Sequence, residues 1–287
     1  MPLLQVLHLG LIDYGTALKL QETLVNLRKR GRIADTLLLL EHPPVITLGR
    51  NAKARNIVAS PESLAERGVE VFEINRGGDV TFHGPGQLVG YPICDLRELT
   101  PGVSGKRIGA VDFVRRMEEV LIRACADFDI GAERVPGLTG VWTSESGEAS
   151  AQASPERAGK KIAAIGVHIS RGVTSHGFAL NVTTDLEQFK LIVPCGISGK
   201  DVTSMEQELG GRVTPGGKKL DIETVEQAIT RQWGYVFGTQ ILWLESLGSL
   251  LSGGEDAPQD VPLQEPEELK KMRQELEISP RDDVFWG

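Results

Sequence analysis

Apolar residues in the first hundred positions follow two different spacings. Leucines recur every three or four residues over positions 16–30, and this segment ends in a basic run, which predicts a helix. Shorter apolar runs at residues 36–40 and 45–48, separated by Glu-His-Pro-Pro, predict two buried strands. Residues 69–74 and 87–94 predict two more strands, on either side of a glycine-rich stretch.

The same two spacings continue further along the chain. A helix is predicted over residues 107–126. Its apolar face collects Val111, Val114, Met117, Leu121 and Ala124. Over residues 165–170 and 178–183 apolar positions alternate with small or polar ones, which predicts two strands joined by a hairpin at residues 171–177. A late helix is predicted over residues 221–233.

This order of elements mixes strands and helices without a regular βαβ alternation. It therefore favours an α+β fold, with a mixed β-sheet flanked by helices, over a doubly wound one. Residues 144–159 are small and polar and predict a mobile surface insertion. Residues 246–265 are typical of a linker, and residues 267–276 predict a short exposed helix. We expect one domain over residues 1–245, followed by a partly disordered acidic extension over 246–287.

The net charge of −8 is concentrated at the C-terminal end. Residues 246–287 hold ten acidic and four basic residues, which leaves the rest of the chain at −2 and argues against a nucleic-acid surface. Two basic groups, at residues 28–32 and 50–55, would suit an acidic protein partner, although a solvated helix end explains the first group equally well. No apolar run approaches the roughly 18 residues of a membrane span, and no signal peptide is recognised.

Three scattered cysteines predict reduced thiols in a cytoplasmic protein. Cys94 lies in an apolar run and Cys125 on the apolar face of a predicted helix, which is typical of small buried residues. Cys195 lies between a proline and a glycine in irregular sequence, where a thiol is exposed rather than packed. An exposed thiol with a base beside it is a nucleophile. The residues alone leave open whether Cys195 is a nucleophile or a packing residue.

Lys161 begins a strand-like apolar run directly after the predicted insertion. An exposed lysine at the edge of a sheet would explain it, as for its neighbour Lys160. A lysine drawn into an apolar pocket would instead have a lowered pKa, because burial disfavours the ammonium, and would exchange protons with a thiol. Both interpretations remain open at this stage.

Residues 76–87 contain four glycines among twelve residues, a density that predicts backbone shaped around a ligand. His83 in this stretch and His176 in the predicted hairpin each precede a glycine. Either histidine would serve as a base for Cys195, and the three together would form a zinc site, although their spacing is not that of a tight ligand set. No P-loop or GxGxxG motif is present, which argues against a nucleotide site.

Taken together, five ordered segments resemble the lipoyl(octanoyl) transferases, the octanoyl-[acyl-carrier-protein]:protein N-octanoyltransferases. The segments are residues 41–49 (EHPPVITLG), 76–87 with Tyr91 beyond, 161–166 (KIAAIG), 176–182 (HGFALNV) and 194–196 (PCG). Any one segment alone would be weak, but the set is specific and covers most of residues 3–210. The insertion makes the loop before Lys161 longer than the family pattern, and the acidic tail beyond about residue 245 has no match in it. The resemblance implies the mixed-sheet catalytic fold shared with biotin and lipoate protein ligases.

The resemblance also implies a reaction, the first step of endogenous lipoate biosynthesis, that needs neither ATP nor another cofactor. The Cys195 thiolate would attack the octanoyl thioester on the phosphopantetheine arm of octanoyl-acyl carrier protein. The acyl-enzyme would then pass its octanoyl group to a lysine on the lipoyl domain of a 2-oxoacid dehydrogenase subunit, or on glycine-cleavage H protein. Lys161 matches the family's catalytic lysine and would act as acid and base. We expect a cytoplasmic monomer that uses no metal, nucleic acid or membrane.

The resemblance further assigns a substrate-binding set that lines an acyl pocket. Its members are Arg76, Gly77, Gly78, Thr81, His83, Gly84, Gln87, Tyr91, Ile165, Gly166, His176, Gly177 and Ala179. Three alternatives remain. An ATP-dependent lipoate or biotin ligase on the same fold would use Lys161 to bind an acyl-adenylate and would not need Cys195. A cysteine hydrolase would use water as acceptor, and a non-catalytic module would only bind acylated carrier protein.

Overall fold

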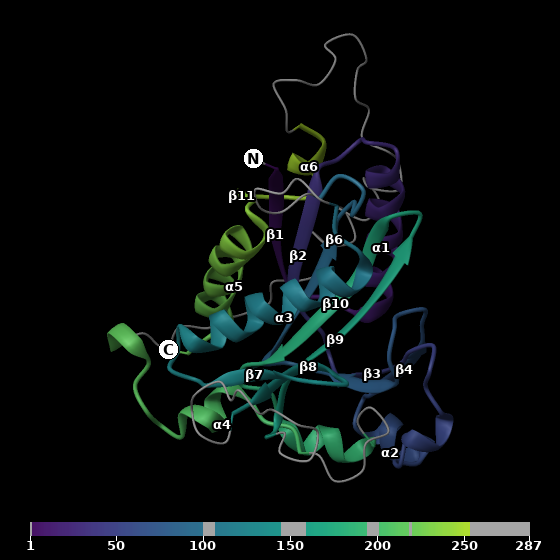
Figure 1. Cartoon of the computed structure of the whole chain (residues 1–287). Coiled ribbons are helices and arrows are strands. Elements are labelled where there is room, and N and C mark those ends of the chain that lie inside the picture. Colours follow the sequence, from purple (N-terminus) through teal and green to yellow (C-terminus); the bar gives the residue numbers. More distant parts are fainter. Residues whose placement is uncertain (1, 100–106, 145–158, 194–200, 218–219, 253–287) are drawn as a thin grey trace, which may run out of the picture.

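The computed structural model describes residues 2–252 except for 100–106, 145–158, 194–200 and 218–219. Two β-sheets and their flanking helices make up this part of the chain (Figure 1). None of its helices combines the length and the apolar character needed to cross a membrane.

The larger sheet has eight strands within the described residues. Across the sheet these are β11 (Gln240–Leu244), β1 (Leu3–Leu11), β2 (Asp35–Glu41), β6 (Gln87–Ile93), β10 (Val173–Asn181), β9 (Lys161–Ser170), β8 (Leu138–Thr143) and β7 (Ala132–Val135). β1 is parallel to both of its neighbours, and the other pairs are antiparallel. The sheet is therefore mixed, and the predicted α+β class is confirmed.

Helices cover both faces of this sheet. The period of two along β2 divides its leucines between the faces. Leu37 belongs to the core formed with α3 (Ala110–Ala126) and α5 (Ile222–Phe237), whereas Leu38 belongs to the core formed with α1 (Tyr14–Lys29). Figure 1 shows α3 lying across the strands with α5 beside it. Helix α1 lies on the opposite side of the sheet. The continuous run of leucines in β2 is thus explained by burial on both faces.

Three of the four predicted helices are confirmed, with shifted ends. The helix predicted over 16–30 begins two residues earlier, because the Asp13 carboxylate accepts a hydrogen bond from the first turn. The helix predicted over 221–233 extends to Phe237 and ends at Gly238, which adopts a left-handed conformation.

The prediction of the apolar face of α3 is wrong for one residue, Val111. Val111 is 72% exposed, whereas Phe113 is fully buried. Two residues correspond to about 200° of rotation around a helix, so these two side chains lie on opposite sides. The helix therefore presents the face that contains Phe113 and Met117 to the core.

The hairpin predicted over residues 171–177 is much shorter in the structure. Arg171 and Gly172, with φ of 52° and 88°, form a two-residue turn, and β10 begins at the next residue. Two positive φ values match the turn type that fits the twist of paired strands. His176 and Gly177 consequently lie inside β10 and not in a turn.

The smaller sheet contains the strands predicted over residues 45–48 and 69–74. β3 (Val45–Leu48) lies between β4 (Glu70–Glu73), which is parallel to it, and the antiparallel β5 (Val80–His83). β5 falls within the glycine-rich stretch, where no strand is predicted; β1, β7, β8 and β11 are likewise not predicted. Shorter helices complete the described fold: η1 (Ala54–Asn56), α2 (Pro61–Glu66), η3 (Leu186–Leu191), α4 (Met205–Leu209), η5 (Pro215–Gly217) and α6 (Ser249–Ser252).

The predicted linker over 246–265 begins as packed structure. Leu247 and Leu250 are buried in the same core as α1, and α6 starts between them. Most of the insertion predicted over 144–159 and the helix predicted over 267–276 lie outside the described residues. The division of the chain at residue 245 stays a prediction.

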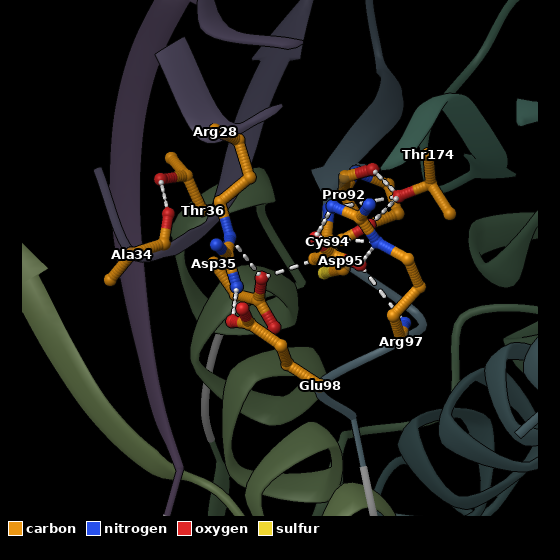
Figure 2. Close-up of polar contacts among 10 residues, drawn as sticks. All are labelled: Arg28, Ala34, Asp35, Thr36, Pro92, Cys94, Asp95, Arg97, Glu98 and Thr174. Carbon is orange, nitrogen blue, oxygen red and sulfur yellow. Dashed lines mark hydrogen bonds and ion pairs between the residues drawn. The ribbon is translucent and has the colours of Figure 1, made fainter. Parts of the chain in front are cut away.

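A network of charged residues, in which Arg28 and Asp35 are buried, joins α1, β2 and the end of β6 (Figure 2). Arg28 donates to Asp35 (2.7 Å) and to Glu98 (2.6 Å), and Asp35 also accepts from the Asp95 N–H (2.9 Å). Burial raises the pKa of Asp35 despite the neighbouring guanidinium. Because the desolvation of this carboxylate is not fully offset, we interpret the pair as fixing geometry more than adding stability.

Replacing Arg28 with Met should lower the free energy of unfolding by about 3–5 kcal/mol, because Asp35 would keep a buried charge without its main partner. Adding Asp35→Asn should restore at least half of the loss, since the amide oxygen still accepts from Asp95 N–H without a charge. Urea unfolding of the three proteins measures both effects. A loss below about 1 kcal/mol for Arg28→Met would contradict this account.

Candidate active site

A cavity of about 590 Å³ lies between β9 and β10 of the large sheet and the small sheet with its loops. Eleven residues of the predicted catalytic and substrate-binding sets line it: Arg76, Gly78, Thr81, His83, Tyr91, Lys161, Ile165, Gly166, His176, Gly177 and Ala179. They come from positions up to 103 residues apart and meet because β9 and β10 face the loop after β4.

Three predicted residues do not line this cavity. Gly77 and Gly84 have backbone roles. The Gly77 N–H donates to Val167 O (3.0 Å), and a Cβ at Gly84 would lie 2.8 Å from the Phe82 ring. Gln87 borders a small adjoining cavity that it shares with Lys161.

Lys161 is the first residue of β9 and is 9% exposed. Its Nζ lies 5.1 Å from the centre of the Trp142 ring, a distance at which the π-electrons attract an ammonium. Its stem passes over Gly140, where a Cβ would lie 2.7 Å from Lys161 Cε. Trp142 and Gly140, both on β8, therefore define the space that the lysine occupies.

Cys195 lies outside the described residues. The residues on either side of segment 194–200 are attached to the cavity wall. Val193 N–H donates to the carbonyl of Asn56, which lines the cavity (2.7 Å), and Lys161 N–H donates to Asp201 O (2.8 Å). The chain therefore leaves and re-enters the described structure next to the cavity.

A chain of amide hydrogen bonds connects His83 to the strand of Lys161. His83 Nδ1 lies 2.7 Å from Gln87 Oε1, and Gln87 Nε2 donates to Asn181 Oδ1 (2.9 Å). Asn181 Nδ2 then donates to Thr203 O (2.9 Å), and Thr203 N–H donates to Lys161 O (2.9 Å). Gln87 thus supports the cavity wall through its bonds to His83 and Asn181.

The histidines around the cavity are neutral. Burial lowers the pKa of His83 to about 3, with a further contribution from His42, and burial with Arg76 lowers that of His176 to about 3. Since Gln87 Oε1 is an acceptor, His83 carries its proton on Nδ1. His176 is held from both sides, by Asn75 at its Nε2 and by Gln21 at its backbone N–H (2.7 Å each).

Arg76 brings a permanent charge into the wall, and the fold holds it firmly. Its guanidinium donates to the Thr47 carbonyl (2.8 Å) and hydroxyl (3.0 Å) and to Gly77 O (3.0 Å). The family resemblance assigns Arg76 to the substrate-binding set but does not predict these hydrogen bonds. The side chain connects β3 to the glycine-rich loop.

Two residues behind and beside this wall were missed by the site prediction. His42 is fully buried; its ring contacts Ile12 O through Nδ1 and the Tyr91 hydroxyl through Nε2 (2.7 Å each), and burial lowers its pKa to about 4. Tyr14, at the start of α1, lines the cavity and stacks on His83 with ring centres 6.1 Å apart. The EHPP segment was a usable signal for His42, but nothing in the local sequence pointed to Tyr14.

Comparison with known proteins shows the family of this chain. The family model described as the lipoyl protein ligase A/B catalytic domain matches residues 13–234. An octanoyltransferase of Koribacter versatilis is 60% identical over 273 residues, which cover 95% of this chain and 98% of that protein. An octanoyltransferase of Acidobacterium capsulatum is 58% identical and covers 86% and 96%.

Solved structures share the fold at low sequence identity. A bipartite lipoate protein ligase of Thermoplasma acidophilum aligns with a TM-score of 0.63 at 13% identity, over 96% of this chain and 92% of that one. Lipoate-protein ligase A bound with ATP aligns with a TM-score of 0.64 at 13% identity, over 96% and 94%. The catalytic fold expected from the sequence is thereby confirmed. On these matches the chain belongs to the lipoyl protein ligase A/B catalytic-domain family and, within it, to the octanoyltransferases.

Proposed function

We propose that this enzyme transfers an octanoyl group from octanoyl-acyl carrier protein to a lysine of a lipoyl domain, through a thioester on Cys195. The observation that carries the proposal is the position of Lys161 in the cavity wall, where its backbone N–H bonds Asp201, the residue after segment 194–200. A lysine beside a thiol would supply the nucleophile with its acid and base.

The other two cysteines are poor nucleophiles, which supports Cys195. Both Cys94 and Cys125 are buried in the core. Burial raises the pKa of the Cys94 thiol well above its usual value and that of Cys125 to about 12. Neither forms a thiolate near neutral pH, so Cys195 is the thiol available for acyl transfer.

The electrostatics of the cavity argue against histidine as the proton carrier. His83 and His176, the alternative bases for Cys195, have pKa values of about 3. An imidazole with so low a pKa takes up a thiol proton very poorly at neutral pH. The Cys–His arrangement considered from the sequence therefore receives no support, whereas Lys161 lies in the wall of the same cavity.

In the first half-reaction Lys161 takes the proton of the Cys195 thiol, and the thiolate attacks the carbonyl of the donor thioester. The carbon–sulfur bond to the donor breaks, and Lys161 returns the proton to the leaving sulfur. In the second half the amine of the acceptor lysine attacks the acyl-Cys195 carbonyl and an amide forms. The amine proton passes through Lys161 to the released sulfur of Cys195.

Octanoyl transfer of this kind needs no ATP. Exchange between two thioesters is nearly balanced, and conversion of a thioester to an amide is downhill. The proposed acceptors are lipoyl domains of 2-oxoacid dehydrogenase subunits and glycine-cleavage H protein, and the proposed setting is a reducing cytoplasm in which a monomer acts.

The acyl-enzyme should be visible by intact-protein mass spectrometry after mixing with octanoyl-acyl carrier protein without ATP. We expect one octanoyl increment on the wild type, discharged by apo lipoyl domain, and none on Cys195→Ser. Cys125→Ala is the matched control and should keep the increment. Labelling that requires octanoate and ATP would instead indicate a ligase.

Lys161→Ala should slow both half-reactions by about 10²–10⁴-fold in single-turnover experiments, because the proton carrier is lost. Lys160→Ala removes the neighbouring exposed lysine and should have little effect. Circular dichroism checks that both variants are folded. Wild-type acylation by folded Lys161→Ala would refute the role of this lysine.

The five histidines should separate into two groups in an NMR titration from pH 5 to 8. Ring signals of His42, His83 and His176 should stay constant, since their pKa values of about 3 to 4 lie below this range. His8 should titrate above its usual pKa because of Glu226, and His168 below it because of burial. A titration of His83 near pH 7 would reopen the Cys–His mechanism.

A further inference from the structure

The rim of the cavity carries a short basic segment that the proposed chemistry does not use. Arg50, Lys53 and Arg55 fall within six positions of a chain whose net charge is −8. Lys53 and Arg55 line the same cavity as Lys161, and both are exposed to solvent. Their charges are therefore available to a ligand that enters the cavity.

The backbone of this segment is fixed on one side by the glycine-rich loop. Gly49 N–H donates to Asp79 O (3.2 Å), Arg50 N–H to Arg76 O (3.0 Å) and Asn51 N–H to Gly78 O (3.1 Å). The segment therefore follows the loop that forms the cavity wall.

On the other side the segment is fixed to the residues that precede Cys195 in the sequence. Val58 N–H donates to Leu191 O (2.9 Å), and Val193 N–H donates to Asn56 O (2.7 Å). Asn56 is the direct neighbour of Arg55. The two basic side chains thus extend from a backbone held in place before any ligand binds, which reduces the entropy lost on binding.

Lys53 and Arg55 make no ion pair with any other residue that the structure describes. Asp79 is the one acidic residue in the described cavity lining, and both of its oxygens are already used. Oδ2 accepts from Asn56 Nδ2 (2.6 Å) and Oδ1 from Val80 N–H (2.8 Å). An external anion is the natural partner for the two cations.

The donor of the proposed reaction brings one anion on the arm that would enter this cavity. Its phosphopantetheine arm carries the thioester at one end and a phosphodiester at the other, whereas the octanoyl chain and the acceptor lysine bring no negative charge. A guanidinium pairs with two phosphate oxygens at once, and an ammonium adds a compact charge. We propose that Lys53 and Arg55 bind the phosphodiester of the donor's phosphopantetheine arm. This inference rests on the proposed function.

Three donors test the assignment: octanoyl-acyl carrier protein, octanoyl-phosphopantetheine and octanoyl-pantetheine. The last two differ only in the phosphate. For Lys53→Ala and Arg55→Ala, kcat/KM with each phosphate-bearing donor should fall about 3- to 10-fold relative to octanoyl-pantetheine, and by more in the double variant. Lys19→Ala and Arg67→Ala remove exposed charges away from the cavity and should leave this ratio unchanged.

Each other outcome decides against the proposal. A loss only with the carrier protein would indicate that the side chains contact the protein surface of the donor and not its phosphate. Equal losses with all three donors would indicate a structural role. The proposed function itself is refuted separately if the wild type transfers an octanoyl group from none of the three donors, or if transfer requires ATP.

Discussion

The cavity depends on a backbone contact between the glycine-rich loop and β9 that leaves no room for a side chain. Gly77 N–H donates to Val167 O at 3.0 Å, and a Cβ at Gly166 would lie 2.6 Å from the Gly77 oxygen. Any residue other than glycine at position 166 would push the glycine-rich loop away from β9. With the loop held there, Arg76 reaches Thr47, and the space between loop and strands becomes the cavity.

Charge is distributed unevenly over this cavity, and the distribution suits the proposed substrate. Besides Lys161 and Asp79, the wall carries neutral histidines and Arg76, whose guanidinium is bonded to Thr47 and Gly77. An apolar acyl chain can lie against such a wall without displacing charged groups from water. The side chains of Lys53 and Arg55 lie at the rim, where a phosphate would remain partly solvated.

Sequence patterns predicted the positions of helices and strands better than the buried faces of helices and the lengths of turns. The periodicity of 107–126 located α3 but put Val111 on the wrong side, since the helix presents Phe113 to the core. Arg171 has a positive φ, which allows the β9–β10 turn to be only two residues long. A positive φ at a residue other than glycine is uncommon and leaves little sign in the sequence. Within the substrate-binding set, Gly77, Gly84 and Gln87 support the cavity instead of lining it.

By itself the sequence determined the fold class, the start of β9 at Lys161 and the family, because strand alternation, helical spacing and ordered motifs are local properties. The tertiary structure alone decided which distant residues meet. Tyr14 stacks on His83, Trp142 faces Lys161, and Asn56 pairs with Val193. These three contacts, between residues up to 137 positions apart, follow from strand order and from the packing of the two sheets. Local periodicity carries no information about such pairings, since each segment would show the same pattern beside a different neighbour.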